Sequence, residues 1–416
     1  MEPDAKRTVV IVATLDTKGE EAAYLRDHVA AWGLETILVD PGILGQALVP
    51  ADVSRYDVAR AAGTTLEALL ERGEKSYAIA RQIDGLIAIV QDLLAQGRLH
   101  GIVSIGGGQG TSIGTAAMRA LPVGLPKVMV STVACGQTTF GPYVGTKDVA
   151  MIHSVADILG LNRVTMRILA QAAAAVTAMA EVGAEAERGD GELVAITQAG
   201  ITTPGVMAVK ERLEALGFEV IAFHCNGIGG QAMEELVHDG AIKGVVDYSP
   251  HEVTDLLFEG LMPAMPGRLE AAGQMGIPQV VVPGATDIRL HGRPEELPED
   301  LRARACVQHT PTHTHVRATA EEMAAVGRWI AERLNAGQGP RAVLIPEQGY
   351  SMLNRRGQVL WDEPANRAFA TAMEEMLLPD VELISLDAHI NDASFAEAVV
   401  QAFLRLRAVQ RGPAQG

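Results

Sequence analysis

Aromatic residues are scarce in this chain, at 4% of 416 residues, whereas glycine and alanine are abundant. Small side chains let helices pack closely on sheets, so this composition is typical of layered α/β structure. Hydrophobic residues make up 48% of the chain, which is ample for buried cores. A chain of this length is too long for one ordinary core, so we expect two domains.

Cysteines are few, odd in number and without Cys-x-x-Cys spacing. They are Cys135, Cys225 and Cys306. This argues against a disulfide framework and favours a reducing compartment, so we expect a cytoplasmic protein. The N-terminus is charged and leads directly into a strand-like run, which does not resemble a signal peptide. The most apolar long segment, 168–184, is rich in alanine and interrupted by polar residues, which indicates a packed helix and not a membrane span.

The chain is acidic, with a net charge of −17 and a pI near 5.1. This charge disfavours binding to the phosphate backbone of nucleic acid or to anionic membranes. It does not exclude a small anionic molecule, which meets only the residues of its own pocket. We therefore expect neither nucleic acid nor membrane as a partner.

One pattern occurs twice along the chain: a strand-like run, a helical pattern, a glycine and a second run. The copies comprise 8–14, 20–31, Gly33 and 34–39 in the first half, and 193–197, 206–216, Gly217 and 218–223 in the second. Each half continues with a run that begins at glycine and another that begins at proline, namely 101–105 and 126–130, then 244–247 and 278–282. Alternating strands and helices predict right-handed βαβ units and a parallel sheet.

The predicted fold class is therefore α/β, with two Rossmann-like doubly wound parallel-sheet domains in tandem, at 1–185 and 190–410. The polar segment 184–191 is the predicted seam. The first domain has an extra helical insertion, roughly 51–97, and the second adds strands near 342–346 and 381–385. We also predict a long, alanine-rich helix from about Met151 to Val182. Such a helix can bridge domains or pack in a dimer, so a homo-oligomer is expected.

Glycines gather where the strand-like run 101–105 ends. The sequence there is Gly101-Ile-Val-Ser-Ile-Gly-Gly-Gly-Gln-Gly-Thr-Ser-Ile-Gly114, and a helix-forming segment follows. A glycine-rich turn that opens a helix presents backbone N–H groups and a partial positive charge to an anion. It is neither a Walker A loop, because no lysine follows the last glycine, nor a strict Gly-x-Gly-x-x-Gly. We predict an anionic, phosphorylated ligand; the alternative is a tight turn that binds nothing.

Polar residues also follow the other predicted strands of the first domain, where ligands of open parallel sheets bind. Lys18 is placed to meet a phosphate and Asp16 to hold Mg²⁺ or a hydroxyl, unless Asp16 or Thr17 caps the helix. Asp40 is a candidate acceptor for ribose hydroxyls or else a turn residue. Two further polar segments are 131–136 and 143–148.

The second domain carries more titratable groups at the same topological positions. The candidates for general acid–base chemistry and for binding a small acid are His224, Glu252, Asp287, His309 and Arg317. Arg317 would clamp a carboxylate. His313 and His315 alternate on a strand and make a metal ion an alternative, although single histidines are more often structural. Cys225 is more often a small packed residue than a nucleophile in such a position.

Several stretches together resemble the UPF0261 family, also described as Tm-1-like ATP-binding proteins. They are VATLDTKGEE at 12–21, SIGGGQGT at 104–111, VMVSTVACG at 128–136, YVGTKDVAMIHSVADILGLNRV at 143–164, FHCNGIGGQAME at 223–234 and VPGATDI at 282–288. The resemblance implies two Rossmann-like domains and ATP with Mg²⁺ bound in the first. The nucleotide contacts it implies are Asp16, Thr17, Lys18, Asp40, Gly106, Gly107, Gly108, Thr111, Ser131, Thr132 and Asp148.

One stretch departs from the family pattern His-Asn-x-x-x-Thr-x-x-Arg. Here His309, Thr314 and Arg317 match, but Thr310 replaces asparagine. The additional histidines at 313 and 315 indicate a different ligand in the second domain. Some relatives are fused to a phosphoenolpyruvate-hydrolase-like barrel, which this sequence does not contain.

Three functions fit these patterns. The first is an ATP-dependent or ATP-regulated metabolic enzyme that acts on a small organic acid at the crevice between the domains. The second is a nucleotide-gated module that binds another protein and turns nothing over. The third is a lyase or hydrolase of a keto acid in which the nucleotide is only structural. The histidines and acids of the second domain favour an enzyme.

Overall fold

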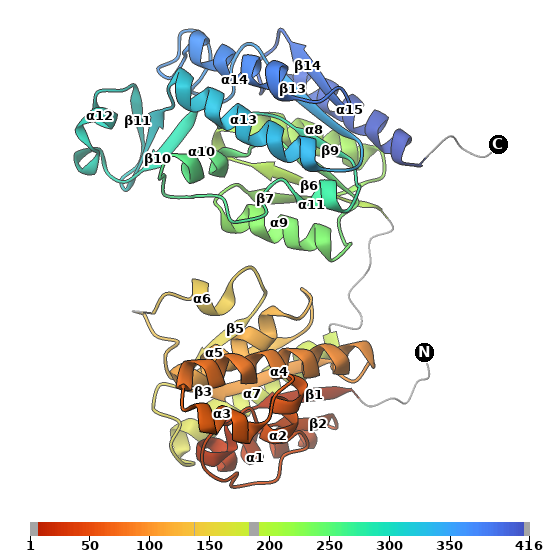
Figure 1. The fold of residues 1–416 in the computed structure, drawn as a ribbon, viewed down its shortest axis with the longest axis vertical. Coiled ribbons are helices and arrows are strands. Elements are labelled where there is room, and N and C mark those ends of the chain that lie inside the picture. Colours follow the sequence, from red (N-terminus) through yellow and green to blue (C-terminus); the bar gives the residue numbers. More distant parts are fainter. Residues whose placement is uncertain (1–6, 137, 183–190, 412–416) are drawn as a thin grey trace, which may run out of the picture. The chain divides into compact units, whose positions relative to one another are not determined.

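The structure, a computed structural model, describes residues 7–136, 138–182 and 191–411. The chain divides into two compact units, 1–188 and 189–416. The predicted seam, 184–191, lies outside the described residues except for Gly191. Each unit contains a parallel sheet between helices (Figure 1), which confirms two Rossmann-like α/β domains.

The first unit has a five-stranded parallel sheet in the order β2-β1-β3-β4-β5. Its strands are β1 (Thr8–Val12), β2 (Glu35–Val39), β3 (Gly101–Gly106), β4 (Lys127–Ser131) and β5 (Ala150–His153). Its helices are α1 (Leu15–Ala31), α2 (Arg55–Ala61), α3 (Leu66–Arg72), α4 (Lys75–Ala95), α5 (Gly108–Arg119), α6 (Gly141–Val144) and α7 (Arg163–Val182). The predicted helical insertion corresponds to α2, α3 and α4.

Both faces of this sheet are covered, which explains the uninterrupted apolar run of β1. Val9 and Ile11 pack with α1 and α7 on one face. Val10 and Val12 pack with α2, α4 and α5 on the other. A strand buried on both faces has no polar alternation, and this is the pattern of a doubly wound sheet.

The prediction of one long helix from about Met151 to Val182 is wrong for the first third of that range. Residues 150–153 form the edge strand β5, and α7 begins only at Arg163. Gly160 has φ +76°, and the Asn162 side chain accepts hydrogen bonds from the backbone N–H groups of Val164 and Thr165. These are helix-start signals, whereas β5 is too short for its period to be recognised in the sequence.

The second unit has a six-stranded parallel sheet in the order β14-β13-β9-β8-β6-β7. These strands are β6 (Leu193–Gln198), β7 (Glu219–His224), β8 (Gly244–Asp247), β9 (Gln279–Val281), β13 (Arg341–Pro346) and β14 (Val381–Leu386). The longer helices are α8 (Thr203–Ala215), α9 (Ile228–His238), α10 (His251–Leu257), α13 (Ala320–Ala336), α14 (Glu363–Met376) and α15 (Ala393–Arg411). Short elements are η1 (Gly200–Thr202), α11 (Ala271–Gln274), η2 (Pro294–Glu296) and α12 (Glu299–Arg302).

An antiparallel sheet in the order β10-β12-β11 is attached to the second unit and has no counterpart in the described part of the first. Its strands are β10 (Ile288–His291), β11 (Cys306–Thr310) and β12 (His313–Arg317). In Figure 1 it lies at one end of the unit, beyond α10. It carries three of the histidines that the sequence singled out, so it brings them to one place.

The repeated pattern of the two halves is a real structural repeat. β1-α1-β2 and β6-α8-β7 occupy the same positions in their sheets. In each copy the second strand, β2 or β7, is at the edge of the sheet, and the first strand, β1 or β6, lies next to it. Gly33 and Gly217 follow the helix in each copy with φ +89° and +88°. This left-handed conformation strains residues with a Cβ atom, which explains glycine at both positions.

No helix in the described ranges is both long and apolar enough to cross a membrane. The alanine-rich helix α7 packs its buried side chains, such as Leu169 and Val176, on the first sheet.

Candidate functional site

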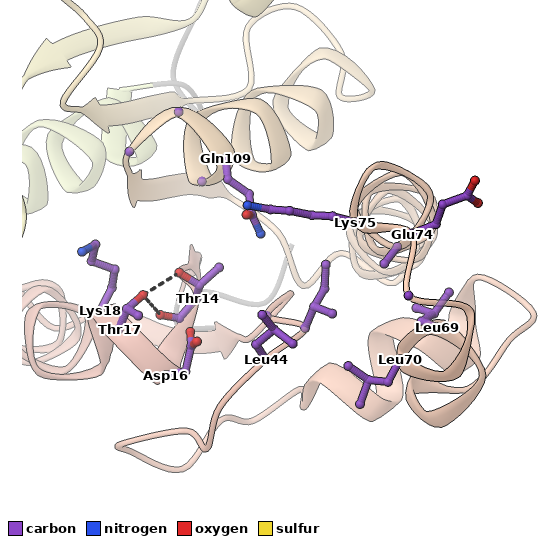
Figure 2. A pocket seen from close by; sticks show the side chains of 17 residues that line it. Thr14, Asp16, Thr17, Lys18, Leu44, Leu69, Leu70, Glu74, Lys75 and Gln109 are labelled. Carbon is purple, nitrogen blue, oxygen red and sulfur yellow. Dashed lines mark hydrogen bonds between the residues drawn. The ribbon is translucent and has the colours of Figure 1, made fainter.

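A cavity of about 480 Å³ opens at the carboxyl ends of β1, β2 and β3 in the first unit (Figure 2). The chain passes from β1 outward to β2 and then crosses back to β3. The loops that follow β1 and β3 therefore diverge and leave a crevice between them, as expected at the switch point of a doubly wound sheet. Its position is the one predicted for the phosphorylated ligand.

The glycine-rich segment forms the predicted strand, turn and helix. β3 ends at Gly106, Gly107 is the N-cap, and α5 begins at Gly108. Gly107 and Gly108 line the cavity with Gln109 and Gly110. The first N–H groups of a helix have no acceptor within the helix, so this end offers donors to an anion. Gly106 stands behind the wall, where a Cβ atom would lie 2.7 Å from the Gly110 Cα atom.

The first turn of α1, directly after β1, places Asp16, Thr17 and Lys18 on the cavity wall. The helix begins earlier than predicted, with Thr14 as its N-cap, so neither Asp16 nor Thr17 has the capping role. Lys18 has non-helical torsion angles, φ −126° and ψ 18°, which interrupt the first turn. Figure 2 shows Asp16 and Lys18 on this side of the cavity.

The insertion supplies the opposite wall, which sequence analysis missed. Leu69 and Leu70 from α3 and Lys75 at the start of α4 line the cavity. Lys75 extends toward Gln109 in Figure 2. Within the described ranges, neither Lys18 nor Lys75 takes part in a salt bridge. The sequence predicts helices here but contains no signal for the side of the sheet on which they fold.

Asp40 does not line this cavity, because its carboxylate is occupied. The residue is 1% exposed, and its side chain accepts hydrogen bonds from Arg55 Nε at 2.9 Å and Nη2 at 2.6 Å. Its other oxygen accepts from the backbone N–H groups of Leu15 and Gly42. Asp40 therefore joins the loop after β2, which lines the cavity, to the start of α1.

Four other predicted contacts lie outside the cavity wall. The hydroxyls of Thr111 and Ser131 are buried and hydrogen-bonded to each other at 2.7 Å. The backbone of Thr132 donates to Gly106, so it supports the loop from behind. Asp148 accepts from Lys127 Nζ at 2.7 Å. Lys127 is the first residue of β4, so Asp148 lies at the amino ends of the strands, opposite to the cavity. This position corrects the prediction that Asp148 contacts the ligand.

Glu252, predicted to be catalytic, belongs to a buried ionic cluster in the second unit. Arg268 is 1% exposed and contacts the carboxylates of Glu252, Asp247 and Glu234. The second oxygen of Glu252 accepts from the backbone N–H of Gly227, just before α9. Both carboxylate oxygens thus contact protein groups, which favours a structural role for Glu252.

Asp287 and Arg317 are also buried, and neither lines the cavity of the first unit or the histidine-lined cavity of the second. Arg317 is 5% exposed and donates to the Asp287 carbonyl at 2.8 Å and to the Asn366 side chain at 2.8 Å. Asp287 accepts from the Ser351 hydroxyl at 2.9 Å. Arg317 therefore joins the antiparallel sheet to α14 and is not free to clamp a substrate carboxylate.

The remaining two catalytic candidates, His224 and His309, do meet at a cavity. This second cavity is about 190 Å³ and lies at the carboxyl ends of β6, β7 and β8, under the antiparallel sheet. His251, His313 and His315 also line it. No group of three or more His, Cys, Asp or Glu side chains among the described residues is arranged to hold a metal ion, so the metal alternative for His313 and His315 has no preformed site.

Two of these histidines have opposite pKa shifts. Burial, with the neighbouring histidines, lowers the pKa of His315 to about 4. Burial also opposes the charge on His251, but the carboxylate of Asp255, whose Oδ2 is 3.5 Å from His251 Nε2, outweighs it and raises the pKa of His251. Cys225 is 2% exposed, and burial raises the pKa of its thiol, as expected of a packed residue and not of a nucleophile.

His315 makes the stability of the second unit pH-dependent. Its pKa is near 6.5 in the unfolded chain and about 4 in the folded one, so between these values the proton favours unfolding. We expect the native chain to lose about 3 kcal/mol relative to His315→Gln as the pH falls from about 7 to 4, at 1.36 kcal/mol per pKa unit. Urea denaturation of both proteins at each pH tests this. The raised pKa of His251 is present in both proteins, so it does not account for a difference between them. If the free energies of unfolding of the two proteins change with pH in parallel, the prediction is wrong.

Comparison with known proteins relates the whole described chain to one family. The model described as "Uncharacterised protein family (UPF0261) N-terminal domain" matches residues 7–185, and the corresponding C-terminal domain model matches 191–407. A UPF0261 protein of Clostridium tetani is 41% identical over 401 residues, which cover 96% of this chain and 99% of that protein.

A more distant similarity is found with a plant protein. The ToMV resistance protein Tm-1(GCR237) of Solanum lycopersicum is 36% identical over 343 residues, 80% of this chain and 45% of the tomato protein. Among solved structures, a UDP-GlcNAc 2-epimerase of Methanocaldococcus jannaschii aligns over 97% of this chain and 93% of its own at 8% identity, with a TM-score of 0.21. That score is too low to carry an argument.

Proposed function

This chain belongs to the UPF0261 family, and from that premise we propose that its first domain binds ATP with Mg²⁺ in the cavity at the ends of β1, β2 and β3. The observation that carries the proposal is that Lys18 and Lys75, neither of which has a salt bridge among the described residues, line the same cavity as the glycine-rich start of α5. Three sources of positive potential around one cavity suit a polyphosphate.

The cavity also suits the other parts of the ligand. Its volume of about 480 Å³ lies within the range of roughly 300–1,000 Å³ that is typical of small-molecule sites. Leu44 and Leu70 line it although they are 64% and 45% exposed, and a bound base would cover such apolar side chains. Of the three carboxylates that were predicted to contact the nucleotide, Asp16, Asp40 and Asp148, Asp16 is the one that lines the cavity. Mg²⁺ is commonly held by one or two carboxylates together with phosphate oxygens, so Asp16 is its proposed protein ligand.

Titration calorimetry of the full chain with Mg-ATP tests the proposal. We expect Lys18→Ala and Lys75→Ala each to weaken binding about 10–100-fold, because a charge-assisted hydrogen bond is worth roughly 1.5–3 kcal/mol. Lys243→Ala, an exposed lysine in the other domain, is the matched control and should bind like the native chain. If Mg-ATP produces no heat, or the two cavity lysines can be removed without effect, the nucleotide site is not here.

The organic-acid part of the predicted function needs a different set of residues. Glu252, Asp287 and Arg317 are buried, and none of them lines the cavity of the second domain, so they do not support direct contact with a substrate. His224 and His309 line the cavity in the second domain. Measurement of ADP release over hours with Mg-ATP separates an ATP-consuming enzyme from a nucleotide-gated binding protein.

A further inference from the structure

The histidine-lined cavity of the second domain has the same place in its sheet as the nucleotide cavity has in the first. β6, β7 and β8 correspond to β1, β2 and β3 in strand order, and the loops that follow them line the cavity. This is again the switch point, where the chain crosses the first strand and leaves a crevice. The two halves thus present two cavities at equivalent positions, with different walls.

The walls of the second cavity do not suit a nucleotide. Its volume is about 190 Å³, less than half that of the first. The glycine-rich start of α9 is already occupied, because the buried carboxylate of Glu252 accepts the N–H of Gly227. No lysine or arginine is among the residues that line it. Its ligand is therefore small and is not held as a polyphosphate.

The side chains that line this cavity can give it a positive charge but not a negative one. Its titratable lining groups are Cys225 and five histidines, namely His224, His251, His309, His313 and His315, and no carboxylate lines it. The Cys225 thiol stays neutral because burial raises its pKa. Protonation of any of the imidazoles makes the cavity positive. A wall that can only gain positive charge suits an anion.

The carboxylate nearest to these histidines is held behind the wall. Asp255 is buried and accepts hydrogen bonds from the backbone N–H groups of Met262 and Leu290, both at 2.9 Å. It also faces His251, whose other ring nitrogen lies 3.0 Å from the Ala285 carbonyl oxygen. His251 is thus fixed by its neighbours, and the carboxylate is fully used within the protein.

His315, one of the lining residues, has a buried polar atom without a hydrogen-bond partner among the described residues. The side chain is 6% exposed, and within the described residues its Nδ1 atom has no hydrogen-bond partner. Its ring stacks on that of His309, with centroids 4.5 Å apart and planes at 16°. A buried ring nitrogen without a partner costs free energy, which a ligand or a bound water recovers. His309, by contrast, is exposed.

We infer that this cavity binds a small carboxylate through the stacked imidazoles of His309 and His315, with His224 and His313 completing its rim. The site is separate from the proposed nucleotide site and does not depend on it. Binding takes up protons, because the anion stabilises the imidazolium form of the rings it contacts. The titratable groups that face His315 are His309 on β11, His313 on its own strand, and His251 and Asp255 on α10.

The experiment is calorimetric titration of the full chain, without nucleotide, with malonate, pyruvate and acetate at pH 6 and pH 8. We expect at least one of them to bind at least tenfold more tightly at pH 6. His309→Ala should weaken that binding at least tenfold, and His315→Gln, which keeps a polar side chain, should remove most of the pH dependence. His238→Ala, an exposed histidine at the end of α9, should change neither.

Other results would overturn the inference. If none of the three carboxylates binds at either pH, or if binding survives His309→Ala unchanged, the cavity is not a carboxylate site. If Zn²⁺ binds and is lost in His309→Ala while the carboxylates do not bind, the histidines form a metal site instead. Because nucleotide is absent from the titration, failure here leaves the Mg-ATP proposal standing, and failure to bind Mg-ATP leaves this one standing.

Discussion

Replacement of Arg268 by alanine is expected to lower the free energy of unfolding of the second domain by about 3–5 kcal/mol. Arg268 is 1% exposed, and its guanidinium contacts three carboxylates. Removing it leaves Glu252, Asp247 and Glu234 buried without their counter-ion. A buried charge that loses its partner has neither water nor the opposite charge to stabilise it, so the loss exceeds that of an ordinary hydrogen bond.

Urea denaturation followed by circular dichroism measures this effect. Arg405→Ala is the matched control, because its ion pair with Glu382 joins two exposed side chains and contributes little. The result also decides the role of Glu252. If Arg268→Ala is no less stable than Arg405→Ala, the cluster is not structural, and Glu252 returns as a candidate catalytic group.

Asp40→Ala is expected to destabilise the first domain by about 3–5 kcal/mol, because it leaves Arg55 charged and buried. It also removes the acceptor of two backbone N–H groups, from Leu15 and Gly42. Mg-ATP affinity should fall as a consequence, since the loop after β2 lines the nucleotide cavity. Thermal unfolding without ligand, followed by calorimetry with Mg-ATP, measures both effects.

Comparison of Asp16→Ala with Asp40→Ala distinguishes a carboxylate that binds the ligand from one that supports the structure. Asp16 lines the cavity and is only partly buried, so its removal should weaken Mg-ATP binding and leave unfolding nearly unchanged. The opposite result, with Asp40→Ala stable and deficient only in binding, would return Asp40 to the predicted contact with the ribose.

Local patterns in the sequence determined the fold and the first cavity's glycine-rich wall. Unbroken apolar runs such as Val9–Val12 specify strands buried on both faces, and their alternation with helices leaves few topologies other than a parallel doubly wound sheet. The strand, glycines and helix around Gly106–Gly110 depend on neighbours in the chain, so their geometry could be predicted. Gly33 and Gly217 likewise revealed the repeat, since a left-handed residue after a helix is a local requirement.

The role of each polar side chain was decided only by the tertiary structure. Asp16 and Asp40 both follow strands of the first sheet, yet one lines a cavity and the other pairs with Arg55, 15 positions along the chain. Lys75 reaches the same cavity from an insertion whose docking side no local pattern specifies. An acid or a histidine at the end of a strand is compatible with binding, catalysis or burial. The choice depends on the charge and the space that distant segments bring to it, and these exist only in the folded chain.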